Sequence, residues 1–144
     1  MKFWDASAVI PLLTDEPTSE TARRLRRNDP ELMVWWATEV ECASALARLE
    51  RHGRVPTTTA VASWERLEDL VGRWIEVDPH PAVRRNARRL LRTHDLRGGD
   101  ALQLAAALQG CEGDPASLGF VCCDERLNEA ASREGFVIID PGTV

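Results

Sequence analysis

The sequence predicts an α/β fold built around a parallel sheet of about five strands. Strand-like and helix-like segments alternate along the chain, the strand-like segments are short apolar runs, and the segments between them show helical periodicity. The chain has 144 residues, a length that suits one core. Residues 1–144 are therefore expected to form a single domain.

Five short runs are expected to form the strands. They span residues 2–5, 32–35, 75–77, 120–122 and 136–139. The last two are apolar throughout, as is typical of strands that are covered on both faces of a parallel sheet. We therefore expect both of them to be fully buried.

Seven segments are expected to be helical. They span residues 7–13, 18–28, 37–51, 57–74, 81–93, a stretch that begins at residue 100, and 124–134. The two long segments 37–51 and 57–74 are predicted to pair as an antiparallel hairpin. Periodicity places Trp64 and Trp74 on the apolar face of 57–74, and Leu90 and Leu91 on that of 81–93. The run ALQLAAAL, which follows Asp100, is apolar almost all round and predicts a central, buried helix.

Composition limits how the chain could bind nucleic acid. The net charge of −5 argues against nonspecific binding by the whole surface, so any RNA contact would need a local basic patch or a metal ion. The four cysteines lack the spacing of a zinc site. Cys42, Cys122 and Cys123 lie in apolar segments and are expected to be buried free thiols. The apolar stretch near the N-terminus is too short to span a bilayer, and a cytoplasmic protein is expected.

Acidic side chains lie where strands end or helices begin. Asp5 and Asp124 each follow a strand, Glu41 lies in the first turns of a helix, and Asp100 opens the buried helix. The carboxyl ends of parallel strands share one edge of the sheet, where ligands bind. These acids can therefore converge, although the same reasoning admits Asp78 and Asp140.

Each acid also has a structural interpretation. Asp5, Asp100 and Asp124 could be N-caps whose carboxylates accept backbone N–H groups. Glu41 follows Thr38 by three residues and fits a capping box. Taken singly, the cap is the more common explanation.

Four carboxylates in one site call for a counter-charge, because like charges raise the pKa of one another. Oxygen ligands without Cys or His suit Mg²⁺ or Mn²⁺ rather than zinc. The histidines form no ligand pattern. A hard divalent cation is therefore the expected cofactor if the acids converge.

Four stretches of the chain resemble a known family. FWDASAVIPLL, WWATEVECASALARLER, LRGGDALQLAAAL and GFVCCDERLNEAA, followed by GFVIID, are similar to the successive motifs of PIN-domain ribonucleases, specifically VapC-like toxins of type II toxin–antitoxin modules. The resemblance runs nearly end to end and implies a PIN-like three-layer α/β/α fold. The middle helices are less diagnostic.

The resemblance also implies the site. Asp5, Glu41, Asp100 and Asp124 would be both the catalytic residues and the metal ligands, which leaves out Asp78 and Asp140. Ser7 matches a small hydroxyl position that would hydrogen-bond a ligand or a metal-bound water. The chain departs from the family at Cys122, where the family often has Thr or Ser.

The implied activity is a Mg²⁺-dependent endoribonuclease that hydrolyses RNA phosphodiester bonds as the toxin of a VapBC-type module. The products would carry 5′-phosphate and 3′-hydroxyl ends. A VapB-like antitoxin and a homodimer are implied as partners. A catalytically silent PIN-like domain that binds RNA or protein is the alternative, and a phospho-receiver domain is disfavoured because the only lysine is Lys2.

Two surface features are left open by the sequence. The segment 81–93 carries a stripe of five arginines that could contact RNA phosphates or could simply be a solvated face; they are Arg84, Arg85, Arg88, Arg89 and Arg92. Trp4, Trp35 and Trp36 cannot all point the same way along short strands, so one of them could be available to a partner.

Overall fold

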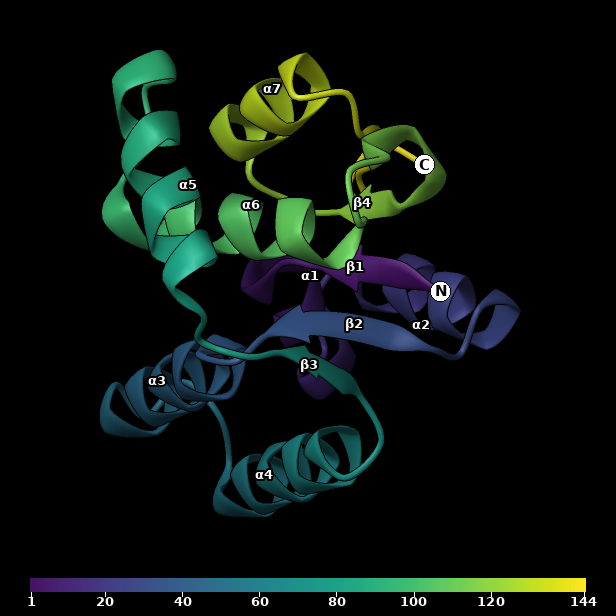
Figure 1. Ribbon diagram of the computed structural model, residues 1–144. Coiled ribbons are helices and arrows are strands. Elements are labelled where there is room, and N and C mark those ends of the chain that lie inside the picture. The colour runs from purple at the N-terminus through teal and green to yellow at the C-terminus, as the bar shows by residue number, and fades with distance from the viewer.

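A computed structural model describes residues 1–144, and its centre is one five-stranded parallel sheet in the order β3-β2-β1-β4-β5 (Figure 1). The strands are β1 (Lys2–Trp4), β2 (Leu32–Trp35), β3 (Ile75–Val77), β4 (Gly119–Val121) and β5 (Val137–Ile139). All four neighbouring pairs are parallel. The predicted α/β fold with a parallel five-stranded sheet is confirmed.

Seven α-helices and one short 3₁₀ turn connect the strands. The helices are α1 (Ala6–Leu13), α2 (Ser19–Asn28), α3 (Thr38–Arg51), α4 (Thr57–Val71), α5 (Pro81–Thr93), α6 (Gly98–Gly110) and α7 (Glu125–Arg133), and the turn is η1 (Pro115–Ser117). Most boundaries lie within one or two residues of those predicted. No helix is both long and apolar enough to cross a membrane.

The helices cover both faces of the sheet and make a three-layer α/β/α fold. On β1, Phe3 packs with α5, α6 and α7, whereas the neighbouring Trp4 packs with α1, α3 and α4. Side chains alternate between the faces of a strand, and β4 divides Phe120 and Val121 between the same two cores. The central strands of the sheet are therefore buried from both sides.

The buried helix α6 lies on the α5–α7 face (Figure 1). Its residues Ala101 and Gln103 to Ala107 are all buried, which confirms the central helix expected from ALQLAAAL. Small alanine side chains let the helix approach the sheet closely. Asp100, in the first turn of α6, is held at the level where β1 and β4 end.

Three predictions of burial or extent are wrong. Val137 in β5 is 55% exposed, because β5 is the last strand of the sheet and has a neighbour on one side only. Leu91 is 42% exposed, while Leu90 is fully buried, since the apolar face of α5 is narrower than the pattern suggested. Helix α4 ends at Val71 with Gly72 as its C-cap, so Trp74 lies outside the helix, in the segment that enters β3, and packs in the core with Leu67 and Leu70.

Most of the tryptophans and cysteines discussed above are buried. Trp4 and Trp35 are buried, whereas Trp36 is 52% exposed, so one of the three is available at the surface. Cys42, Cys111 and Cys122 are buried and Cys123 is partly buried, and all four are free thiols. The expectation of buried free thiols is confirmed for Cys42 and Cys122, whereas Cys123 is free but only partly buried.

Candidate active site

All four acids singled out in the sequence line one pocket at the carboxyl end of the sheet. The pocket has a volume of about 460 Å³ and is lined by Asp5, Glu41, Asp100 and Asp124 together with residues of α1 and α3. We call it the carboxylate pocket. Asp78 and Asp140 follow β3 and β5 on the same edge, but neither lines it.

Asp5 is the most deeply buried of the four, at 4% exposed. It ends β1 and is the N-cap of α1, where its Oδ2 accepts the backbone N–H of Ser7 at 2.9 Å. The N-cap interpretation of Asp5 is therefore correct. Oδ1 is in none of the side-chain hydrogen bonds of the fold, so capping and ligand binding are compatible at this residue.

Ser7 joins the end of β1 to the end of β4. Its Oγ accepts the backbone N–H of Cys123 at 2.9 Å and lies 3.6 Å from Cys122 Sγ. Ser7 also lines the carboxylate pocket. The hydroxyl thus holds two strand ends in register beside Asp5.

Cys122 occupies the centre of this junction. Its Sγ lies 3.7 Å from Asp5 Oδ2, and it accepts the backbone N–H of Asp124 at 3.2 Å. A thiol makes weaker hydrogen bonds than the hydroxyl expected from the resemblance. The contact nevertheless links Asp5 to the turn that carries Asp124.

Asp124 is also an N-cap, because its Oδ1 accepts the backbone N–H of Leu127 at 2.9 Å at the start of α7. Asn128 stabilises the same turn by donating its Nδ2 to the carbonyl of Cys122 at 3.1 Å. Asp124 is only partly buried. Its second oxygen is free to face the pocket.

Glu41 does not belong to a capping box. The N-cap of α3 is Ala37, with no side-chain cap hydrogen bond, and Thr38 is the first helical residue. Glu41 Oε1 instead accepts a hydrogen bond of 3.1 Å from Gln103 Nε2, which also donates to Thr38 Oγ1 at 3.1 Å. The capping-box interpretation is therefore wrong, and Glu41 is held toward α6.

Asp100 is not an N-cap either, because α6 begins two residues earlier than predicted. Its N-cap is Arg97, which makes no side-chain cap hydrogen bond. Asp100 stands in the first turn, where a carboxylate is favoured by the helix dipole. It lines both the carboxylate pocket and a second pocket beside it.

Burial and mutual repulsion favour the protonated form of three of these acids. Burial raises the pKa of Asp5, with the charge of Asp100 adding to the effect and hydrogen bonds from Ser7 opposing it. Burial and the charge of Asp5 raise the pKa of Glu41 to about 7. Burial and the charge of Asp124 raise the pKa of Asp100, against the positive charge of Arg97. A cation bound among them would relieve this repulsion.

The donor set fits a hard divalent cation in its chemistry, because every acidic group that lines the carboxylate pocket is an oxygen donor. No group of three or more His, Cys, Asp or Glu side chains is already arranged so that it could hold a metal ion. Mg²⁺ usually keeps several water ligands and takes only one or two carboxylates directly.

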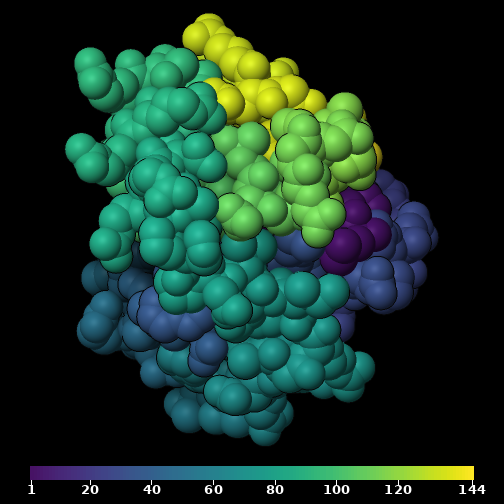
Figure 2. Space-filling view, viewed as in Figure 1, coloured from purple at the N-terminus to yellow at the C-terminus, as the bar shows by residue number.

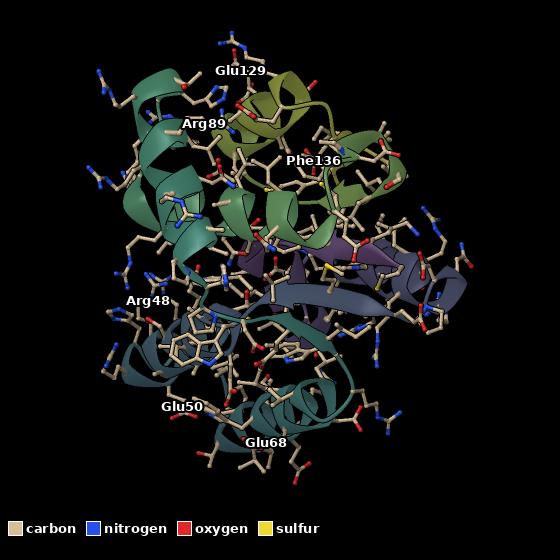
Figure 3. The ribbon with its side chains drawn as sticks, viewed as in Figure 1. Arg48, Glu50, Glu68, Arg89, Glu129 and Phe136 are labelled. Atoms are coloured by element: carbon tan, nitrogen blue, oxygen red, sulfur yellow. The ribbon has the colours of Figure 1, made fainter.

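Four further polar residues surround the acids, and the sequence did not single them out for the site. Gln103 is fully buried; it is the one polar side chain in the run ALQLAAAL and is three residues after Asp100, a signal that helical spacing could have revealed. Arg48 lines the carboxylate pocket from α3 and is labelled in Figure 3. Arg97 and Arg126 line the adjoining pocket, and arginines are too frequent in this chain for these to stand out.

Comparison with known proteins identifies the family. The family model described as PIN domain matches residues 2–132. The chain is 34% identical over 134 residues to Ribonuclease VapC45 and to Ribonuclease VapC49, from two strains of Mycobacterium tuberculosis. Each of these matches spans 92% of this chain and 90% of the relative.

Solved structures share the fold at lower identity. FitAcB from Neisseria gonorrhoeae superposes with a TM-score of 0.68 at 17% identity, over the whole of both chains. PAE2754 from Pyrobaculum aerophilum gives a TM-score of 0.64 at 23% identity, and the match covers 99% of this chain and 84% of that one. Together with the sheet order and the family match, these similarities show that the chain belongs to the PIN-domain family and is similar to its VapC ribonucleases.

Proposed function

We propose that this protein is a metal-dependent endoribonuclease, the toxin of a VapBC-type toxin–antitoxin module. The observation that carries the proposal is the convergence of Asp5, Glu41, Asp100 and Asp124 on one pocket. The names of the VapC relatives, both ribonucleases, support the substrate class. The acids come from four separate segments, so a set of unrelated helix caps does not account for their meeting.

The carboxylates of Asp5, Asp100, Glu41 and Asp124 would hold Mg²⁺ or Mn²⁺. Bound there, such a cation would bind the scissile phosphate, lower the pKa of a water molecule and stabilise the leaving oxygen. Asp5 and Asp100 are the first candidates for direct ligands. Glu41 would ligate or would orient the attacking water, and Asp124 would act directly or through a water.

Residues that contact these acids would position them. Gln103 fixes one oxygen of Glu41, which leaves the second oxygen to face the substrate. Ser7 and Cys122 fix the relative position of Asp5 and Asp124 through the backbone of residues 122–124. Ser7 would in addition hydrogen-bond a ligand or a metal-bound water.

The proposed partners are an RNA substrate, a VapB-like antitoxin and a second copy of the chain. One of the structural neighbours is described as FitAB bound to an IR36 DNA fragment, which supports a regulatory partner by analogy of fold. Light scattering of the protein, with and without a co-expressed antitoxin candidate, measures the dimer and the complex.

The experiment that tests the proposal is cleavage of single-stranded RNA by purified protein in Mg²⁺ and in EDTA. Asp5→Asn and Asp100→Asn are expected to lower the rate by about 100-fold or more, since each removes a charged ligand. Asp78→Asn is the matched control, because Asp78 follows a strand on the same sheet edge outside the pocket. Equal activity of all variants would reject the site; RNA binding without cleavage would favour the catalytically silent alternative.

A further inference from the structure

A second pocket adjoins the carboxylate pocket and sets two arginines beside three carboxylates. It has a volume of about 530 Å³ and no hydrophobic lining residue; its lining is Arg97, Gly99, Asp100, Asp124, Glu125 and Arg126. We call it the arginine pocket. Asp100 and Asp124 line both pockets, so an RNA strand that crosses the carboxylates would continue directly into the arginine pocket.

The two arginines are available for a ligand. Arg97 makes no ion pair in the fold, and Arg126 makes only one, with Asp95 at 3.8 Å, where the side chains are 68% and 94% exposed. Three other surface arginines are held more firmly, because Arg23, Arg73 and Arg133 pair with carboxylates at 2.5 to 2.7 Å. A long, solvated ion pair such as Arg126–Asp95 contributes little, so a phosphate can replace Asp95.

The backbone leaves room for a ligand next to Arg97. A Cβ atom added to Gly98 or Gly99 would have nothing within 4 Å. These glycines are therefore not required by packing within the chain. They keep the surface between Arg97 and Asp100 open.

An anionic strand needs cations close to this site. The chain has a net charge of −5, and the carboxylates themselves repel RNA on either side of any bound metal. None of the five α5 arginines lines either pocket, and Arg89 is held by Glu134, which follows α7, at 2.9 Å. The cations that border the carboxylates are Arg97 and Arg126 on one side and Arg48 on the other.

We propose that Arg97 and Arg126 bind the RNA phosphate next to the scissile one, in the arginine pocket, and so position the strand across the carboxylates. The inference rests on the proposed function, because it takes single-stranded RNA as the substrate. Two guanidinium groups from different elements can hold one phosphate by charge-assisted hydrogen bonds. Neither residue touches the reacting atoms, so both are positioning residues.

The test is binding of a fluorescein-labelled single-stranded RNA, about 12 nucleotides long, in EDTA, measured by anisotropy across a series of NaCl concentrations. EDTA removes both metal binding and cleavage from the measurement. The double variant R97Q/R126Q is expected to bind about tenfold more weakly. Its plot of log Kd against log salt should be shallower by about 0.7 for each phosphate that the variant no longer neutralises.

The matched control is R24Q/R54Q, which removes the same charge from two exposed arginines outside both pockets. It should keep the wild-type salt slope. Equal slopes for R97Q/R126Q and R24Q/R54Q would overturn the inference, as would a wild-type protein that does not bind the RNA. If the arginines merely offset the carboxylate charge, R97Q/R126Q would shift the pH profile of cleavage and leave the salt slope unchanged, which also overturns it.

A second readout uses cleavage in Mg²⁺. Removal of a positioning interaction that is made equally in the ground state should raise KM and leave kcat within about twofold. A protein that binds RNA through Arg97 and Arg126 but never cleaves it would support the inference and reject the proposed function. If the wild-type protein cleaves RNA but R97Q/R126Q keeps the wild-type salt slope, the proposed function is supported and the inference is rejected.

Discussion

For two acids of the pocket, helix capping and ligand binding are compatible, although the sequence presents them as alternatives. Asp5 and Asp124 cap α1 and α7 with one oxygen each, and both line the pocket. A carboxylate has two oxygens and about four acceptor sites, so one cap bond leaves capacity for a ligand. The cap hydrogen bond fixes the orientation of each carboxylate.

Glu41 carries a pH dependence of stability. Its pKa in the folded protein is raised to about 7 by burial and by the charge of Asp5, above the value of about 4.3 expected in the unfolded chain. Between these values the folded state binds more protons than the unfolded state. The free energy of unfolding should therefore fall as the pH rises through this window.

We predict that Glu41→Gln removes this loss and stabilises the metal-free protein at pH 8 by about 1 kcal/mol, after allowance for solvent screening of a half-buried group. Urea denaturation in EDTA at pH 5 and pH 8 measures the difference. Glu39→Gln, on the same helix and outside the pocket, is the control. An identical pH dependence in wild type and Glu41→Gln would show that Glu41 is ionised without penalty.

At the scale of elements, periodicity located every helix and strand but not the width of their buried faces. The alternation of patterns revealed the order of the elements because each strand and helix has its own period. Leu90 and Leu91 are adjacent and equally apolar, and only the packing of α5 against α6 and α7 decides that Leu90 faces inward. Likewise, the sequence of β5 predicts a buried strand, and only the sheet order reveals it as an edge.

The difference in burial between Leu90 and Leu91 predicts that their substitutions change the free energy of unfolding by different amounts. Leu90→Ala should lower the free energy of unfolding by about 2 to 5 kcal/mol, because it opens a cavity in a fully buried site. Leu91→Ala, the matched control, should change it by about 0.5 kcal/mol or less. Thermal or urea unfolding of both variants measures this, and a larger loss for Leu91→Ala would mean that α5 is rotated from its described orientation.

The candidate site shows the same division between what patterns can and cannot predict. The acids could be proposed from the sequence because strand ends in a parallel sheet meet at one edge. The contact between Gln103 and Glu41 spans 62 residues, and no local pattern encodes it. Helix α6 begins at Gly98 rather than at Asp100. Its first two residues are glycines, which usually argue against a helix, so the sequence did not predict this start.

At the scale of the whole molecule, charge is distributed unevenly. Helix α5 carries five arginines. Its side chains project along the upper left edge of the view in Figure 2, and Arg89 is labelled on this helix in Figure 3. The acidic groups of the site lie at the carboxyl end of the sheet, bordered by Arg48, Arg97 and Arg126. An acidic protein can thus approach an anionic strand through a local surface rather than through its net charge.

If Asp5, Glu41, Asp100 and Asp124 together hold a divalent cation, calorimetric titration of metal-free protein with MgCl₂ should detect its binding. Wild-type protein should bind Mg²⁺ and melt at a higher temperature as the ion is added. Asp5→Asn and Asp100→Asn should lose the binding, and Asp78→Asn should keep it. Binding that is equal in all four proteins, or absent from the wild type, would contradict the account.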